Sequence, residues 1–73
     1  MTPTSLRALL AQVLTAAGHD EAYWLAKIGE VEKRPSVENI HSNWRVTPRA
    51  KGKDLGALQN AVALVRAEHP YVD

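Results

Sequence analysis

The fold of this chain is decided by residues 20–48, DEAYWLAKIGEVEKRPSVENIHSNWRVTP, and above all by how many helices they contain. Asp20 is a typical N-cap, because its carboxylate can accept hydrogen bonds from the free amides of a first helical turn. Gly29 is the natural place for such a helix to end, since glycine adopts the left-handed conformation of helix C-termini. These two residues predict a short helix over 20–29.

A second helix is predicted over residues 36–45. Ser36 directly follows a proline and is a good N-cap, and the apolar residues after it recur at spacings of three and four. A rival interpretation stays open, because the alternation of Trp44 and Val46 is also typical of an extended segment over 42–47.

Two short helices followed by basic residues have the outline of a helix-turn-helix DNA-binding unit. Residues 30–34 would form its turn, since they are too polar and too few for an element of their own. The turn is about two residues longer than the usual connection, so the outline is generic and indicates no family. If residues 42–47 are extended, the recognition helix is lost and only the basic segment remains.

Amphipathic helices are predicted on both sides of this central unit. Residues 3–17 carry leucine, valine and alanine along one helical stripe, and Gly18 ends it. Residues 54–68 show the same periodicity and stop before Pro70. The predicted fold class is therefore all-α, a single domain built as a small bundle of three to four short helices, about 3–17, 20–29, 36–45 and 54–68.

Length and composition bound the type of protein. A core built from 73 residues supplies only about 3–5 kcal/mol, so a homodimer is expected. The absence of cysteine excludes disulfides and thiolate metal sites. The sequence shows neither a basic signal-peptide start nor an apolar run of about 20 residues, so we expect a cytoplasmic protein without a membrane partner.

Charge is distributed unevenly along the chain, although the net charge is only +1. Residues 1–32 and 54–73 are each net negative, whereas residues 33–53 hold six basic side chains against Glu38 alone. Such a basic block between acidic segments favours binding to a polyanion. The basic side chains are Lys33, Arg34, Arg45, Arg49, Lys51 and Lys53, the last three in or beside a predicted basic loop over 47–53.

On the helix-turn-helix interpretation, Asn39, Asn43 and Arg45 would read base edges. Asparagine can bond adenine in two places, and arginine can do the same with guanine. The other basic residues of 33–53 would neutralise phosphates, and each such contact adds salt-sensitive affinity. The leading function is thus a small DNA-binding regulator.

Enzyme chemistry has no support in the sequence. His19, His41 and His69 lack the spacing of a metal site, and no glycine-rich phosphate loop is present. We therefore expect no enzymatic activity, no metal and no cofactor.

The adjacent aromatic residues Tyr23 and Trp24 supply an alternative function. Neighbouring helical residues cannot both face one core, so one of the two should be partly exposed. An exposed aromatic is a common anchor for a protein partner. The alternative is therefore a protein-docking module, an inhibitor or adaptor that binds its partner through an amphipathic helix and this aromatic pair.

Overall fold

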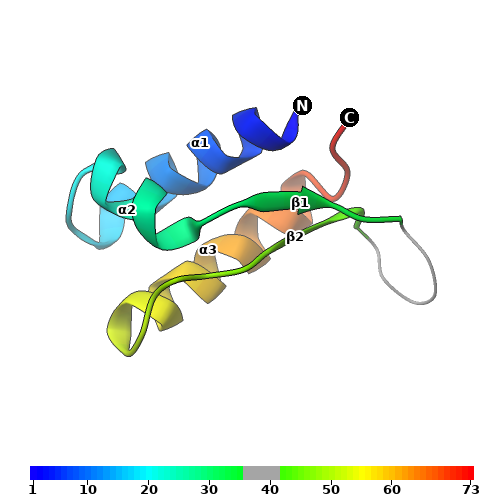
Figure 1. Ribbon diagram of the computed structural model, residues 1–73. Helices are drawn as coiled ribbons and strands as arrows, with labels where there is room; N and C mark the ends of the chain where they lie inside the picture. The colour runs from blue at the N-terminus through cyan, green and yellow to red at the C-terminus, as the bar shows by residue number, and fades with distance from the viewer. Residues whose placement is uncertain (36–41) are drawn as a thin grey trace.

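The computed structural model describes residues 1–35 and 42–73 (Figure 1). Its elements are α1 (Pro3–Leu14), the 3-10 helix η1 (Thr15–Ala17), α2 (Glu21–Ile28), β1 (Val31–Lys33), β2 (Trp44–Val46) and α3 (Lys53–Glu68). The two strands run side by side across α3, and the two chain ends lie near each other. None of the helices in the described ranges has the length and apolarity needed to span a membrane.

The two N-terminal helices form as predicted over 3–17 and 20–29. The Thr2 hydroxyl accepts a hydrogen bond from the Ser5 amide at 3.1 Å, and α1 continues into η1 up to Ala17. The Asp20 carboxylate caps α2 by accepting from the Tyr23 amide at 2.9 Å. Short polar side chains at these N-caps satisfy amides that have no partner within the helix.

The all-α prediction is wrong, because β1 and β2 form a two-stranded antiparallel sheet. Residues 31–33, predicted as part of a turn, are β1, and Val31 is buried. The predicted helix over 36–45 cannot reach its end, because residues 44–46 are β2. The extended alternative for that segment is confirmed, whereas residues 36–41 lie outside the described part of the chain. The helix-turn-helix interpretation is lost with this correction.

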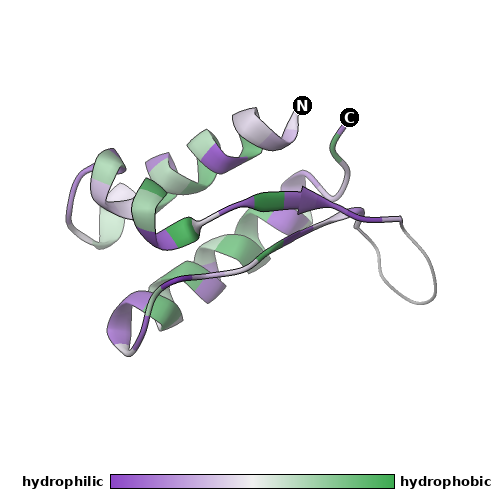
Figure 2. Cartoon of the chain, in the orientation of Figure 1, coloured by the Kyte–Doolittle hydropathy of each residue, from purple (hydrophilic) through white to green (hydrophobic). Residues whose placement is uncertain are grey.

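Register explains why the polar hairpin is stable. Val31 pairs with Val46 and Lys33 with Trp44, so the apolar members of these pairs lie on the core side. Glu32 and Arg45 pair on the opposite side, where both are exposed. Figure 2 shows the result, with hydrophilic residues over much of the hairpin and hydrophobic ones recurring along the helices.

The prediction of a helix over 54–68 is confirmed by α3, which starts one residue earlier, at Lys53. The core lies between α1, α2, the hairpin and α3. Burying a leucine or valine side chain of this core contributes about 1.5–3 kcal/mol. Its buried members are Leu6, Leu10, Ala11, Leu14, Trp24, Ile28, Val31, Trp44, Leu58, Ala61, Val65 and Val72.

Candidate functional site

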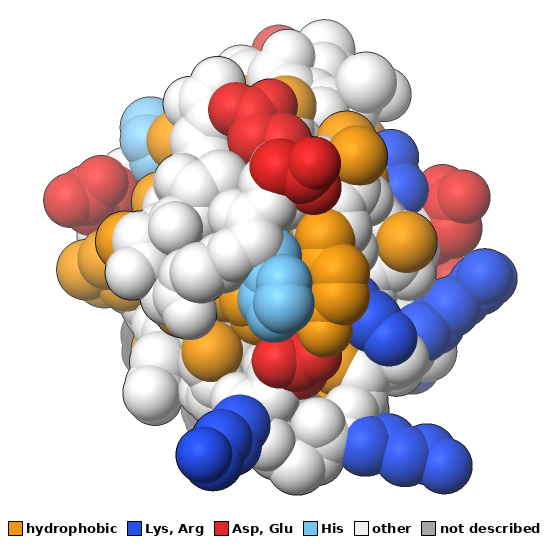
Figure 3. Space-filling model, turned by 90° about the vertical axis from the view of Figure 1, so that its left-hand side faces the viewer, with side chains coloured by type: hydrophobic (Ala, Val, Ile, Leu, Met, Phe, Trp, Pro, Cys, Tyr) orange, Lys and Arg blue, Asp and Glu red, His pale blue; other side chains and the backbone are white. Residues whose placement is uncertain are grey.

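The basic residues of the central segment are all exposed and are called here the basic surface: Lys33, Arg34, Arg45, Arg49, Lys51 and Lys53. They follow the hairpin and the segment that leads from β2 into α3. Figure 3, a view of one end of the molecule, shows Lys and Arg side chains reaching outward at its right-hand and lower edges. Acidic side chains lie near the centre of that face and also at its left-hand and right-hand edges.

Glu32 is the acidic member of the hairpin. Its carboxylate oxygen Oε2 lies 3.0 Å from Arg34 Nη2 and 3.9 Å from Arg45 Nε. These ion pairs are exposed, so each contributes at most about 1 kcal/mol to stability. Their main effect is electrostatic, because one carboxylate partly neutralises two guanidinium groups. Glu32 was not among the predicted site residues, and only the strand register brings it opposite Arg45.

The segment after β2 is irregular from Thr47 to Gly52, as predicted for the basic loop. Its first part is fixed to α2, because the Arg49 amide donates to the Lys27 carbonyl at 2.8 Å. Arg49, Lys51 and Lys53 form no ion pair with any residue in the described ranges. These three side chains therefore present charge that no described carboxylate pairs with. The segment that carries them is bonded to α2 at Arg49.

Gly29 makes the close approach of this segment to α2 feasible. Its φ of +74° is unfavourable for other residues, and a Cβ there would lie 2.8 Å from the Thr47 carbonyl oxygen. Arg7 fixes the same place from α1, donating to the carbonyls of Gly29 at 2.6 Å and Leu25 at 2.7 Å. Arg7 is thus structural, and its charge does not belong to the basic surface.

The two predicted base-reading residues that the structure describes, Asn43 and Arg45, differ in environment. Asn39 lies outside the described residues. The half-buried Asn43 points its amide at the C-terminal segment, where Nδ2 donates to the Val72 carbonyl and Oδ1 accepts from the Val72 amide. Of the two that the structure describes, Arg45 lies exposed on the basic surface.

The two adjacent aromatic residues of α2 differ in environment. Trp24 is 1% exposed and donates from Nε1 to the Gly18 carbonyl, so it is a core residue. Tyr23 is half-buried, stacks on His19 with ring centroids 3.8 Å apart, and donates from its hydroxyl to the Asp54 carboxylate. That hydrogen bond, together with the negative charge of Asp54, raises the pKa of Tyr23 above 10.0.

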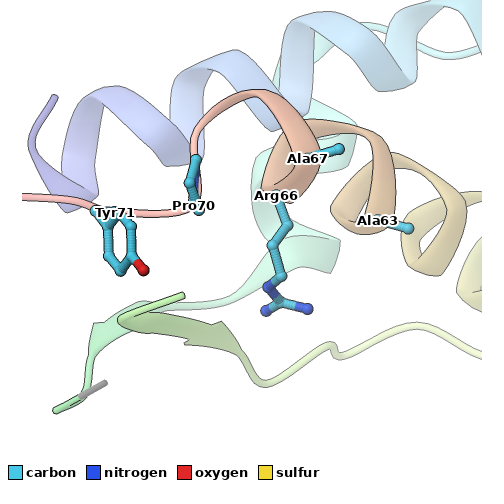
Figure 4. A pocket seen from close by; sticks show the side chains of 5 residues that line it. All are labelled: Ala63, Arg66, Ala67, Pro70 and Tyr71. Carbon is cyan, nitrogen blue, oxygen red and sulfur yellow. The ribbon is translucent and has the colours of Figure 1, made fainter. Parts of the chain in front are cut away.

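Arg66 joins α3 to the hairpin and was not among the predicted site residues. Its guanidinium carbon lies 4.5 Å from the centre of the Trp44 ring, and Nη2 donates to the Trp44 carbonyl at 3.2 Å. Its Nε is buried and has no hydrogen-bond partner among the described residues. Figure 4 shows Arg66 and Tyr71 directed to the same side, along an open hollow of about 610 Å³ that Pro70 also lines.

Neither a metal site among the described residues nor a similar protein gives a further indication of function. Within residues 1–35 and 42–73, no group of three histidine, aspartate or glutamate side chains is placed to hold a metal ion. No protein-family model, curated protein or solved structure is significantly similar to this chain. The feature with the most direct chemical meaning is therefore the basic surface.

Proposed function

We propose that this protein binds nucleic acid through its basic surface, by contacts to backbone phosphates. The observation that carries the proposal is the set of six exposed basic side chains along one hairpin and the segment after it, opposed within the described strands by Glu32 alone. Neutralising phosphates releases condensed counterions, which drives binding without any contact to a base.

The shape of the surface suits a linear polyanion. Arg45 lies in β2, Arg49 and Lys51 follow in the irregular segment, and Lys53 begins α3, so these charges are spread along the chain and are not clustered at one point. Cations spread in this way fit successive phosphates of a nucleic-acid strand better than they fit a small anion.

Sequence-independent binding follows from the same geometry. A two-stranded ribbon can enter the major groove, but reading bases there requires free donor and acceptor side chains. The Asn43 side-chain amide is held by Val72, so of the two predicted base-reading residues that the structure describes, Arg45 is the exposed one. We expect phosphate contacts to dominate the affinity. A nucleic-acid partner and the absence of cysteine both fit a cytoplasmic location.

The protein-docking alternative is less well supported, because the aromatic pair Tyr23 and Trp24 is engaged within the fold. Trp24 is buried, and the Tyr23 hydroxyl and ring are both engaged within the fold. Interface anchors are aromatic side chains that a partner can enclose, and neither residue offers a whole ring for that.

The sharpest test compares two substitutions with the same change in net charge. Glu32→Gln removes the carboxylate that pairs with Arg34 and Arg45, whereas Glu21→Gln removes an exposed carboxylate from the first turn of α2. Binding to a fluorescent duplex of random sequence is followed by anisotropy. We expect Glu32→Gln to tighten binding about three- to tenfold and Glu21→Gln to change it less than about twofold. Equal effects of the two would contradict a localised binding surface.

A further inference from the structure

One face of the molecule carries no charge. Within residues 1–17 the only charged side chain is Arg7, and it points inward to the carbonyls of Leu25 and Gly29. The stretch 56–65 of α3 has no charged residue. Helices α1 and α3 pack against each other, and residues from 13–17 and 57–64 line one hollow, so the uncharged sides of both segments form one surface. Exposed helix faces usually carry charge, and its depletion is typical of the centre of an interface.

A hollow lies in this neutral face, with a volume of about 340 Å³. The hollow is open and lined largely by small side chains, with Ala16 and Ala17 from η1 and Ala57 from α3. Leu64 also lines the hollow and is 56% exposed, which makes it one of the most exposed large hydrophobic residues of the described chain. The face therefore holds an open, mostly apolar hollow with one exposed leucine side chain in its lining.

We propose that this neutral face binds a second copy of the chain, with Leu64 of each copy entering the hollow of the other. An isologous two-fold contact requires a surface that is complementary to itself, and a knob beside a hollow meets that requirement. The lack of charge supports the same occupant, because two identical charged faces would repel each other. A different partner of marked charge would instead find no complementary group here.

The arrangement of the dimer follows from the position of Leu64. For Leu64 to reach the hollow around Ala57 of the other copy, the two α3 helices must cross in antiparallel orientation near Asn60. Gln59 and Ala63 lie on a different side of α3, where they line a hollow shared with Arg45 and the rest of the hairpin. Arg45 and the hairpin of each copy therefore lie away from the proposed contact.

Sedimentation velocity of the whole chain over about 1 to 500 µM tests the proposal, since an interface of modest size gives micromolar affinity. Leu64→Glu places a charge in the hollow, and Ala63→Glu places the same charge one residue away, outside it. We expect the unaltered chain and Ala63→Glu to dimerise equally and Leu64→Glu to dimerise at least about 30-fold more weakly. A monomer throughout, or equal dimerisation of all three proteins, would overturn the proposal; circular dichroism verifies that the variants fold.

Cross-linking tests the geometry independently, because the chain contains no cysteine of its own. Asn60→Cys is expected to form a disulfide-linked dimer under mild oxidation, since the two α3 helices cross near this position. Gln59→Cys, one residue away on the hairpin side, is the matched control and is expected to stay largely unlinked. Faster linking of Gln59→Cys than of Asn60→Cys would show that α3 meets its copy through another face.

Discussion

Asn43 holds the C-terminal segment by exchanging two hydrogen bonds with the backbone of Val72. The amide nitrogen donates to the Val72 carbonyl at 2.8 Å, and the amide oxygen accepts from the Val72 amide at 2.7 Å. The Asn43 side chain thereby pairs with the Val72 backbone through one donated and one accepted hydrogen bond, as the backbone of a neighbouring strand would. The backbone amide of Asn43 also donates to the Pro70 carbonyl, and the backbone amide of Asp73 donates to the Met1 carbonyl, so the segment is tied at both ends.

Asn43→Ala is expected to lower the free energy of unfolding by about 1–3 kcal/mol, because two half-buried hydrogen bonds are lost together. Urea denaturation followed by tryptophan fluorescence measures the change. Gln59→Ala, at an exposed position of α3, is the control and should stay within about 0.5 kcal/mol of the unaltered chain. A value for Asn43→Ala as small as that of the control would mean that the segment is not held in solution.

Gly29 and Gly52 form a matched pair for testing the contact between α2 and the segment after β2. Their backbone angles are alike, with φ of 74° and 61° and ψ of −138° and −129°. A Cβ at Gly29 meets the Thr47 carbonyl oxygen at 2.8 Å, whereas a Cβ at Gly52 meets nothing within 4 Å. Gly52→Ala should therefore cost about 1–3 kcal/mol from backbone strain alone, and Gly29→Ala about 2 kcal/mol more. Equal costs in urea denaturation would show that the contact is absent.

Arg66 is expected to act through packing and not through its charge. Arg66→Met keeps an apolar side chain over the Trp44 ring and removes the buried, unpaired Nε, so stability should change by less than about 1 kcal/mol. Arg66→Ala removes the packing as well and should cost about 1–3 kcal/mol. Thermal denaturation of both variants decides the question, and equal losses would show that the guanidinium group itself is required.

Tyr23 is expected to make stability depend on alkaline pH. Its folded-state pKa lies above 10.0 because the hydroxyl donates to the Asp54 carboxylate, so this stabilisation is complete below pH 10 and is lost as pH rises further. In Tyr71→Phe, Tyr23 is the only remaining tyrosine, and its ultraviolet absorbance can be titrated alone. The midpoint should exceed 10.0 and fall toward that value when Asp54→Ala is added. A midpoint that Asp54→Ala leaves unchanged would contradict the hydrogen bond.

The three helices could be predicted from the sequence because their determinants are local. Apolar residues recur at helical spacing, and the caps at Thr2 and Asp20 lie within three residues of the amides they accept from. The hairpin could not be predicted in the same way, since each strand has only three residues and Glu32 and Lys33 of β1 are polar. The alternation of Trp44 and Val46 was the one local indication of it.

The same distinction between local patterns and long-range contacts applies to the candidate site. The basic surface could be predicted because charge is visible in the sequence and lysine and arginine are rarely buried. The structural role of Asn43 could not, because its partner Val72 lies 29 residues away. The contact between Arg66 and Trp44, which lie 22 residues apart, could not be predicted for the same reason. Contacts across such separations depend on the tertiary fold and leave no periodic pattern.

The salt dependence of duplex DNA binding tests the central claim most directly. Anisotropy titrations of the unaltered chain with a random-sequence duplex are repeated from low to physiological salt. Contact with about four or five phosphates predicts that the logarithm of the association constant falls against the logarithm of the salt concentration with a slope of about −4. Replacing Arg49, Lys51 and Lys53 with glutamine should reduce that slope to about −1 to −2. No binding at low salt, or the same slope after the triple replacement, would contradict nucleic-acid binding by the basic surface.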